Sequence, residues 1–216
     1  MYKFRSASLL AAAVALMLVA LSGPVAAGSP FIEDYQDKGR AGIAGNGDCT
    51  FDPGTGDESC FWVDVFAQTG WIKEGGVRHK GGTVCIFMSE FEYDASEDLV
   101  TDVISEGCGS ASVAVAKDLS TASADGTIEL DVCNYDSETD DCIPDGTRDV
   151  DVDLEWDAEG PLFSNRGTYT ETFGGCTYQE RFRGTFKPAE VEGTIAGHDL
   201  FGEVAKGAAK RSFRCH

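Results

Sequence analysis

The feature that most constrains the fold is an eight-residue segment in which acidic and apolar residues alternate without exception. Residues 149–156 read Asp-Val-Asp-Val-Asp-Leu-Glu-Trp, so Val150, Val152, Leu154 and Trp156 fall on one side of an extended chain and the acids on the other. A helix would scatter both kinds of residue around its axis, whereas an antiparallel strand with one solvated face separates them. The segment therefore predicts a half-buried strand.

The same alternation recurs in other short windows. In residues 127–133 we expect Ile128, Leu130 and Val132 to point inward. The preceding Asp125-Gly126 pair favours a tight turn, which predicts a hairpin over about residues 112–133. Residues 204–210 are a segment where a short helix competes with a strand. The other strand candidates are 61–67, 83–89, 98–104, 112–117, 167–173, 177–186, 190–195 and 211–215.

Roughly ten short strands separated by Gly, Asn, Asp and Pro predict an all-β fold. We expect an antiparallel β-sandwich, with a β-barrel as the alternative. Residues 28–216 are long enough for a single domain with its own core, since a chain of this size buries about 70% of its unfolded surface. Residues 28–48, which are rich in glycine and charge, are expected to form an irregular N-terminal arm.

Residues 1–27 resemble a secretory signal peptide. Lys3 and Arg5 precede an apolar run over residues 9–21, and the small residues Val25-Ala26-Ala27 predict cleavage after Ala27. The apolar run is shorter than the about 20 residues that a membrane span needs. We therefore expect a secreted protein, extracellular or periplasmic, with no membrane insertion after signal cleavage.

Eight cysteines follow the expected cleavage site, and an even number of cysteines in an exported chain predicts disulfides. Two pairs are close in sequence and flank turn-rich loops, and the remaining two pairs follow by elimination. The predicted pairs are Cys49–Cys60, Cys133–Cys142, Cys85–Cys108 and Cys176–Cys215.

The chain is strongly acidic, with 17 Lys and Arg against 37 Asp and Glu and a net charge of −20. Such a charge excludes nucleic acid and anionic lipid as expected partners, because both need a positive surface. Residues 90–159 contain most of the excess, with 22 acidic residues against Lys117 and Arg148. The acidic side of residues 149–155 either faces water or receives a cationic protein partner.

A loop between two of the cysteines carries spaced carboxylates of the kind that Ca²⁺ binds. The candidate metal ligands are Asp136, Glu138, Asp140, Asp141 and Asp145. The spacing departs from an EF-hand loop, because Asp141 stands at the position of the turn glycine and Thr147 at that of the closing glutamate. A solvated loop without an ion is the alternative, and we predict no other cofactor.

The sequence contains no recognisable catalytic motif, and its three histidines lie in unrelated contexts. We therefore expect a non-enzymatic secreted binding or interaction module. A secreted hydrolase that uses unrecognised carboxylates and a Ca²⁺-stabilised structural domain are the alternatives. Trp62 and Phe66 fall on the opposite side of the strand from Phe61, Val63 and Val65. If that side is exposed, the rings would suit a carbohydrate or a protein partner, and if another part of the fold covers it, they belong to the core.

Overall fold

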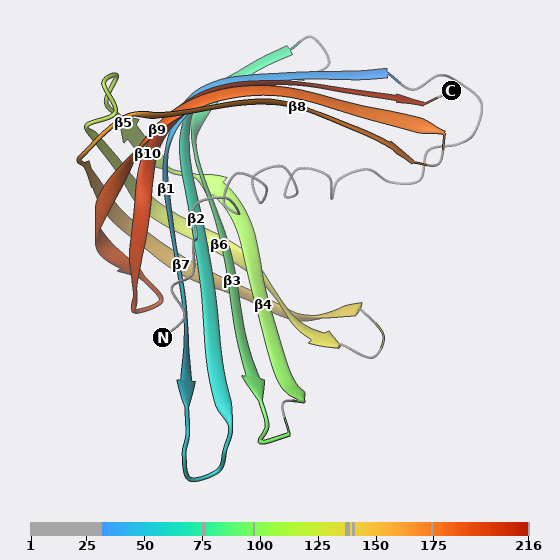
Figure 1. The fold of residues 1–216 in the computed structure, drawn as a ribbon, viewed down its shortest axis with the longest axis vertical. Coiled ribbons are helices and arrows are strands. Elements are labelled where there is room, and N and C mark those ends of the chain that lie inside the picture. The colour runs from blue at the N-terminus through green and yellow to red at the C-terminus, as the bar shows by residue number, and fades with distance from the viewer. Residues whose placement is uncertain are drawn as a thin grey trace.

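A computed structural model describes residues 32–74, 77–96, 98–136, 139, 141–173 and 175–215. The predicted signal peptide lies outside these residues. Regular structure in the described part consists of ten strands (Figure 1), and it contains no helix with the length and apolar character of a membrane span. The strands are β1 (Ile32–Phe51), β2 (Glu58–Glu74), β3 (Val77–Tyr93), β4 (Leu99–Ser110), β5 (Ser112–Val115), β6 (Thr121–Asp136), β7 (Asp141–Ala158), β8 (Phe163–Phe173), β9 (Cys176–Ile195) and β10 (His198–Cys215).

The strands form one antiparallel sheet with a ring-like order. Neighbours follow the sequence β10, β1, β2, β3, β4, β6, β7 and β9, and β9 pairs again with β10. Strand β8 is the last strand in this order and pairs with β9, and β5 pairs with β6. The expected all-β fold, antiparallel pairing and number of strands are therefore confirmed.

Several strands are longer than the ring and continue into an arm, which extends to the right at the top of Figure 1. We define the arm as residues 32–40, 69–82, 163–187 and 205–215. Strand β9 pairs with β8 up to Phe186 and with β7 from Ala189 onward, and Pro188 stands at this change of partner. Because proline has no N–H to donate, it suits a position between two ladders, where its carbonyl accepts the Glu159 N–H at 3.1 Å.

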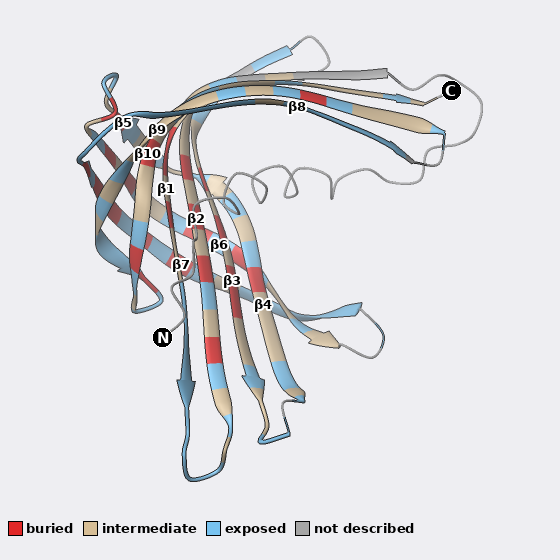
Figure 2. Cartoon of the chain, in the orientation of Figure 1, coloured by how far each residue is buried: buried red, intermediate tan, exposed pale blue. Residues whose placement is uncertain are grey.

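The core lies inside the ring, where the inner sides of the strands meet (Figure 2). Strand β7 alternates buried and exposed residues from Asp149 to Ala158, as its sequence predicts. The largest core side chain is Trp156, which is 1% exposed and donates its Nε1–H to the Ile43 carbonyl at 3.0 Å. Strands β2, β3 and β6 add buried aliphatic side chains to the same cluster.

Residues 28–48 were expected to be irregular, and this expectation is wrong from Ile32 onward. These residues form β1, which pairs with β10 on one side and with β2 on the other. Its glycines make room for large neighbours: a Cβ at Gly42 would lie 2.8 Å from the Trp156 ring, and one at Gly47 would lie 2.5 Å from the Trp62 ring. The sequence of β1 resembles a loop because it is rich in glycine, and side chains of other strands fill the space beside these glycines.

Two local predictions are corrected in detail. The hairpin near residues 112–133 exists as β5 and β6, but its turn is at residues 116–120 rather than at Asp125-Gly126. Gly126 lies within β6, opposite Val152. Residues 204–210 form a strand rather than a helix, because β10 pairs there with both β1 and β9 and this pairing outweighs the helix propensity of alanine and lysine.

All four predicted disulfides are confirmed, and each joins two neighbouring antiparallel strands. They are Cys49–Cys60 between β1 and β2, Cys85–Cys108 between β3 and β4, Cys133–Cys142 between β6 and β7, and Cys176–Cys215 between β9 and β10. A chain with four disulfides and no free cysteine is typical of an oxidising extracellular environment.

Candidate functional site

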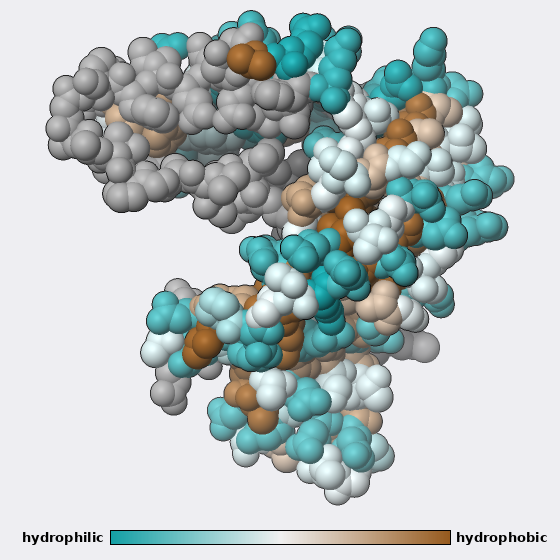
Figure 3. Space-filling model, turned by 180° about the vertical axis from the view of Figure 1, so that it is seen from behind, coloured by the Kyte–Doolittle hydropathy of each residue, from teal (hydrophilic) through white to brown (hydrophobic). Residues whose placement is uncertain are grey.

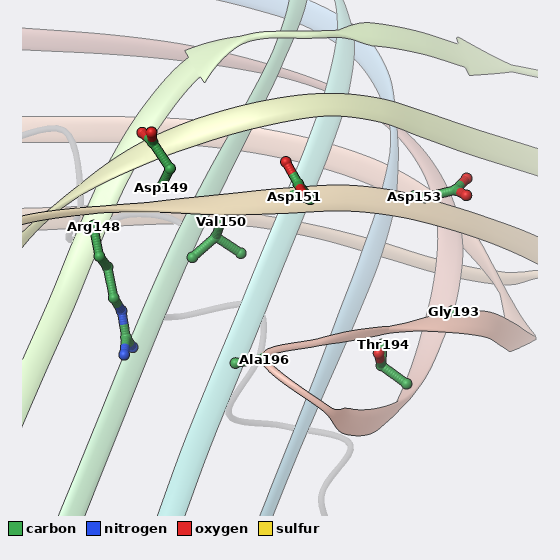
Figure 4. Close-up of a pocket in the computed structure, with 8 residues that line it drawn as sticks. All are labelled: Arg148, Asp149, Val150, Asp151, Asp153, Gly193, Thr194 and Ala196. Carbon is green, nitrogen blue, oxygen red and sulfur yellow. The ribbon is translucent and has the colours of Figure 1, made fainter.

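A pocket of about 630 Å³ opens in the wall of the ring, where β7 separates from β9 (Figure 4). The two strands pair only between Glu155–Ala158 and Ala189–Glu192. The gap begins beyond the Glu155–Glu192 end of this short ladder. Residues 148–153 of β7 line one side of it, and residues 193–196 of the β9–β10 turn line the other.

The chemistry of this pocket is divided between its two sides. The Arg148 side chain points inward, where Nη1 lies 3.7 Å from a Glu90 carboxylate oxygen and Nη2 lies 3.4 Å from the Met88 sulfur. Its Nε is buried and has no hydrogen-bond partner. Asp149, Asp151 and Asp153 point away from Arg148, toward the outer surface (Figure 4). The pocket therefore does not place these carboxylates around one bound group.

Three of the five candidate Ca²⁺ ligands, Asp136, Asp141 and Asp145, are described, and they lie on β6 and β7 near the loop that joins these strands. Asp136 and Asp141 are opposite each other across the strands, whereas Asp145 accepts a hydrogen bond from Asn134 Nδ2 at 3.2 Å. Glu138 and Asp140 lie outside the described residues. Among the described side chains, the closely spaced group of potential metal ligands is elsewhere, at Glu58 beside the Cys49–Cys60 disulfide, whose sulfurs are already bonded. Calcium binding near this loop stays a prediction.

A second candidate site lies on the outer side of β2, where the sequence predicted an aromatic pair. Trp62 is 49% exposed, while Val63 and Val65 on the inner side of the same strand are buried. The six-membered ring of Trp62 lies against Gly47 of β1, where a Cβ would leave no space for it. The indole N–H donates to Asp64 Oδ2 at 2.6 Å. This arrangement fixes the indole against the sheet and leaves half of it accessible.

Neighbouring strands extend this surface on the same outer side. Phe201 of β10 is 72% exposed and is opposite Gly45, which is in turn opposite Asp64. Phe87 of β3 is opposite Asp64 on the other side and is partly exposed. We call Trp62, Asp64, Phe66, Phe87 and Phe201 the aromatic platform. It combines apolar rings with one carboxylate, which is a composition that binds polar ligands with apolar faces.

Two carboxyl groups on this outer surface have raised pKa values. Burial raises the pKa of Asp64, and the Trp62 hydrogen bond opposes part of that increase. Burial also raises the pKa of Glu203 on β10. Glu203 is opposite Ile43 of β1, which is in turn opposite Phe66 of β2. Both groups therefore retain protons to a higher pH than exposed carboxyls do.

The raised pKa of Asp64 predicts a pH-dependent effect of Asp64→Asn. Because the folded state holds this proton more tightly than the unfolded chain, ionisation of Asp64 lowers the free energy of unfolding as the pH rises above 3.8. Asparagine removes that cost and can still accept the Trp62 N–H. Thermal melts should show a variant more stable than the wild type at neutral pH, with the difference vanishing below pH 3.8. A variant less stable at neutral pH would contradict this reasoning.

Sequence reasoning found Trp62 and Phe66 but missed the rest of the platform. Asp64 shares their side of β2, so its alternation with Val63 and Val65 was an available signal. Phe201 comes next to them only through the pairing of β1 with β10, which no local pattern reveals. Protein-family models and curated protein sequences give no match to this chain.

Proposed function

We propose that this chain is a secreted, non-enzymatic binding module and that its aromatic platform binds a carbohydrate. Export through the predicted signal peptide, with cleavage after Ala27, is part of the proposal. The four disulfides support an oxidising destination. A binding role agrees with the absence of a catalytic motif from the sequence.

The observation that carries the proposal is the seating of Trp62. Its ring rests on a glycine backbone, its N–H is held by Asp64, and its accessible part needs no rearrangement before it contacts a ligand. A preorganised aromatic ring loses little conformational freedom on binding. The apolar face of a sugar ring can cover the indole, while Asp64 Oδ1 accepts a hydrogen bond from a hydroxyl group.

The net charge of the chain narrows the ligand class. The platform contains no basic side chain, so the net charge of −20 disfavours an acidic polysaccharide at this site, over distances up to the Debye length, which is about 8 Å at physiological ionic strength. The one ionisable group of the platform is itself a carboxylate. Neutral glycans are therefore the favoured ligands, and their affinity should depend little on salt.

The test is to measure binding of a panel of neutral polysaccharides to the oxidised protein by titration calorimetry. Trp62→Ala should weaken binding by at least about 30-fold, since truncation of a central aromatic anchor costs about 2 kcal/mol or more. Tyr169→Ala is the matched control, because Tyr169 of β8 is also 49% exposed and lies outside the platform. The Tyr169→Ala variant should bind the polysaccharide with the affinity of the wild type.

Two outcomes would reject the carbohydrate site. One is equal loss of affinity in the Trp62→Ala and Tyr169→Ala variants, which would place the ligand elsewhere or make the effect nonspecific. The other is that no polysaccharide in the panel binds the folded wild-type protein. Chemical turnover of a bound glycan would instead favour the hydrolase alternative.

A further inference from the structure

Charge on the strands is separated between two surfaces. The first covers the outer side of β6, of β7 and of residues 190–192 of β9. All its carboxylates are exposed. Figure 3, seen from behind, shows hydrophilic side chains over much of the described surface. We call these residues the acidic wall: Asp125, Glu129, Asp131, Asp149, Asp151, Asp153, Glu155, Asp157, Glu190 and Glu192.

The acidic wall places like charges directly across from one another. The opposing pairs are Asp125 with Asp153, Glu129 with Asp149, Glu155 with Glu192, and Asp157 with Glu190. Such cross-strand pairs destabilise a sheet. Thr127 donates its hydroxyl to Asp151 at 2.8 Å, but no described basic side chain forms an ion pair with any carboxylate of the wall. The wall therefore carries an uncompensated negative field.

The second surface lies on the arm and has the opposite charge. It continues the inner side of the strands beyond the core: Val204 is buried, and Lys206 and Lys210 follow on the same side of β10. We define the cationic face by its exposed members, Lys38, Arg166, Arg181, Arg183, Lys206, Lys210 and Arg214. The described residues on this side of β8, β9 (177–187) and β10 (206–214) include no acid.

Like charges are opposed on the cationic face as well. Arg183 is opposite Arg166 of β8, and Arg181 is opposite Lys210 of β10. None of these four side chains forms an ion pair with a described carboxylate. A shallow pocket of about 240 Å³ lies between Arg181, Arg183 and Lys210, so the charged groups leave space beside them for another surface.

We propose that the acidic wall of one copy docks on the cationic face of a second copy, so that the protein associates head to tail. Both surfaces are β-sheet faces, on which same-side residues repeat every about 6.6 Å along a strand and about 4.8 Å across strands. Rows of carboxylates and rows of basic groups therefore have matching spacing. Docking removes the repulsion within each row by placing opposite charges between them.

This contact joins two different surfaces, so it is heterologous and builds a ring or an open chain rather than a two-fold dimer. The sequence of β7 left a cationic protein partner as one reading of its acidic side. In this proposal, that partner is the cationic face of a second copy of the chain. The inference is independent of the carbohydrate site, because the aromatic platform belongs to neither surface.

Sedimentation velocity of the oxidised protein tests the proposal. At about 0.01 M salt, where the Debye length is about 30 Å, the mean mass should rise with protein concentration. At about 1 M salt, where it is about 3 Å, the protein should be monomeric. Trp62→Ala should associate like the wild type, which keeps this result separate from the carbohydrate test.

Charge reversal identifies the surfaces. One variant carries Arg181→Glu, Arg183→Glu and Lys210→Glu, and the other carries Asp151→Lys, Asp153→Lys and Glu155→Lys. Each variant alone should associate less than the wild type at low salt, because the reversed surface loses most of its net charge and attracts the opposite surface less strongly. An equimolar mixture should associate again, since each variant offers a surface that the other lacks. Circular dichroism checks that both variants fold, and renewed association in the mixture is a second check.

A third variant controls for the change in net charge. Asp57→Lys, Glu92→Lys and Asp98→Lys alter exposed acids outside the wall, and this protein should still associate. The proposal is overturned if the wild type stays monomeric at low salt or if the mixed variants do not associate. A monomeric wild type that binds heparin through Arg181 and Arg183 would assign the cationic face to a separate polyanion instead.

Discussion

Trp156→Ala should lower the free energy of unfolding by about 3–5 kcal/mol, the range for removing a large aromatic side chain from a core. Trp156 is 1% exposed and lies against Gly42 and Gly202, so neighbouring backbone on β1 and β10 shapes its site. Paired strands relax little into the resulting cavity. Chemical denaturation of the oxidised protein measures the loss, with Trp62→Ala as the control because its side chain is half exposed.

Two further substitutions show how the Trp156 site works. Trp156→Phe retains most of the packing but loses the hydrogen bond to the Ile43 carbonyl, which should cost about 0.5–1.5 kcal/mol for the bond itself. Gly42→Ala places a methyl group 2.8 Å from the indole ring and should destabilise the wild type. In the Trp156→Ala background that methyl group has space, so its cost should disappear. Additive effects would mean that Gly42 and Trp156 do not share one packed site.

The second large effect concerns the disulfide at the end of the arm. Replacing Cys176 and Cys215 with serine should cost about 4 kcal/mol in the chain-entropy account, because the bond closes a loop across a sequence separation of 39. Replacing Cys133 and Cys142, whose separation is 9, should cost about 2.6 kcal/mol by the same relation. Denaturant unfolding without reductant compares the two variants. The reverse order would show that the native contacts around each bond outweigh the loop length.

The four disulfides could be predicted because strand order follows the sequence. Antiparallel hairpins bring together cysteines on either side of a turn, which is why Cys49 pairs with Cys60. Elimination gave Cys85–Cys108 correctly because β3 and β4 are also consecutive strands. The same reasoning gave the buried side of β7, where strict alternation leaves one answer.

What failed depended on neighbours that are distant in sequence. The glycines of β1 are typical of a loop, although Gly42, Gly45 and Gly47 leave the space that Trp156, Asp64 and Trp62 fill. Phe201 joined the aromatic platform through β10, and the cations of the arm gathered on one side through pairings among β8, β9 and β10. Net charge alone also concealed this separation, because the acids outnumber the bases over the whole chain.

The continuity of β9 and β10 has a mechanical consequence. Their pairing runs without a register shift from Phe201 opposite Glu190 to Cys215 opposite Cys176, so the same two strands belong to the core and to the arm. No hinge interrupts this ladder, and swinging the arm against the ring would break several hydrogen bonds at once. The ring and the arm are therefore connected by one continuous two-stranded ladder. A ligand that binds the arm and stabilises these strands should therefore also slow amide hydrogen exchange in the core sections of both strands.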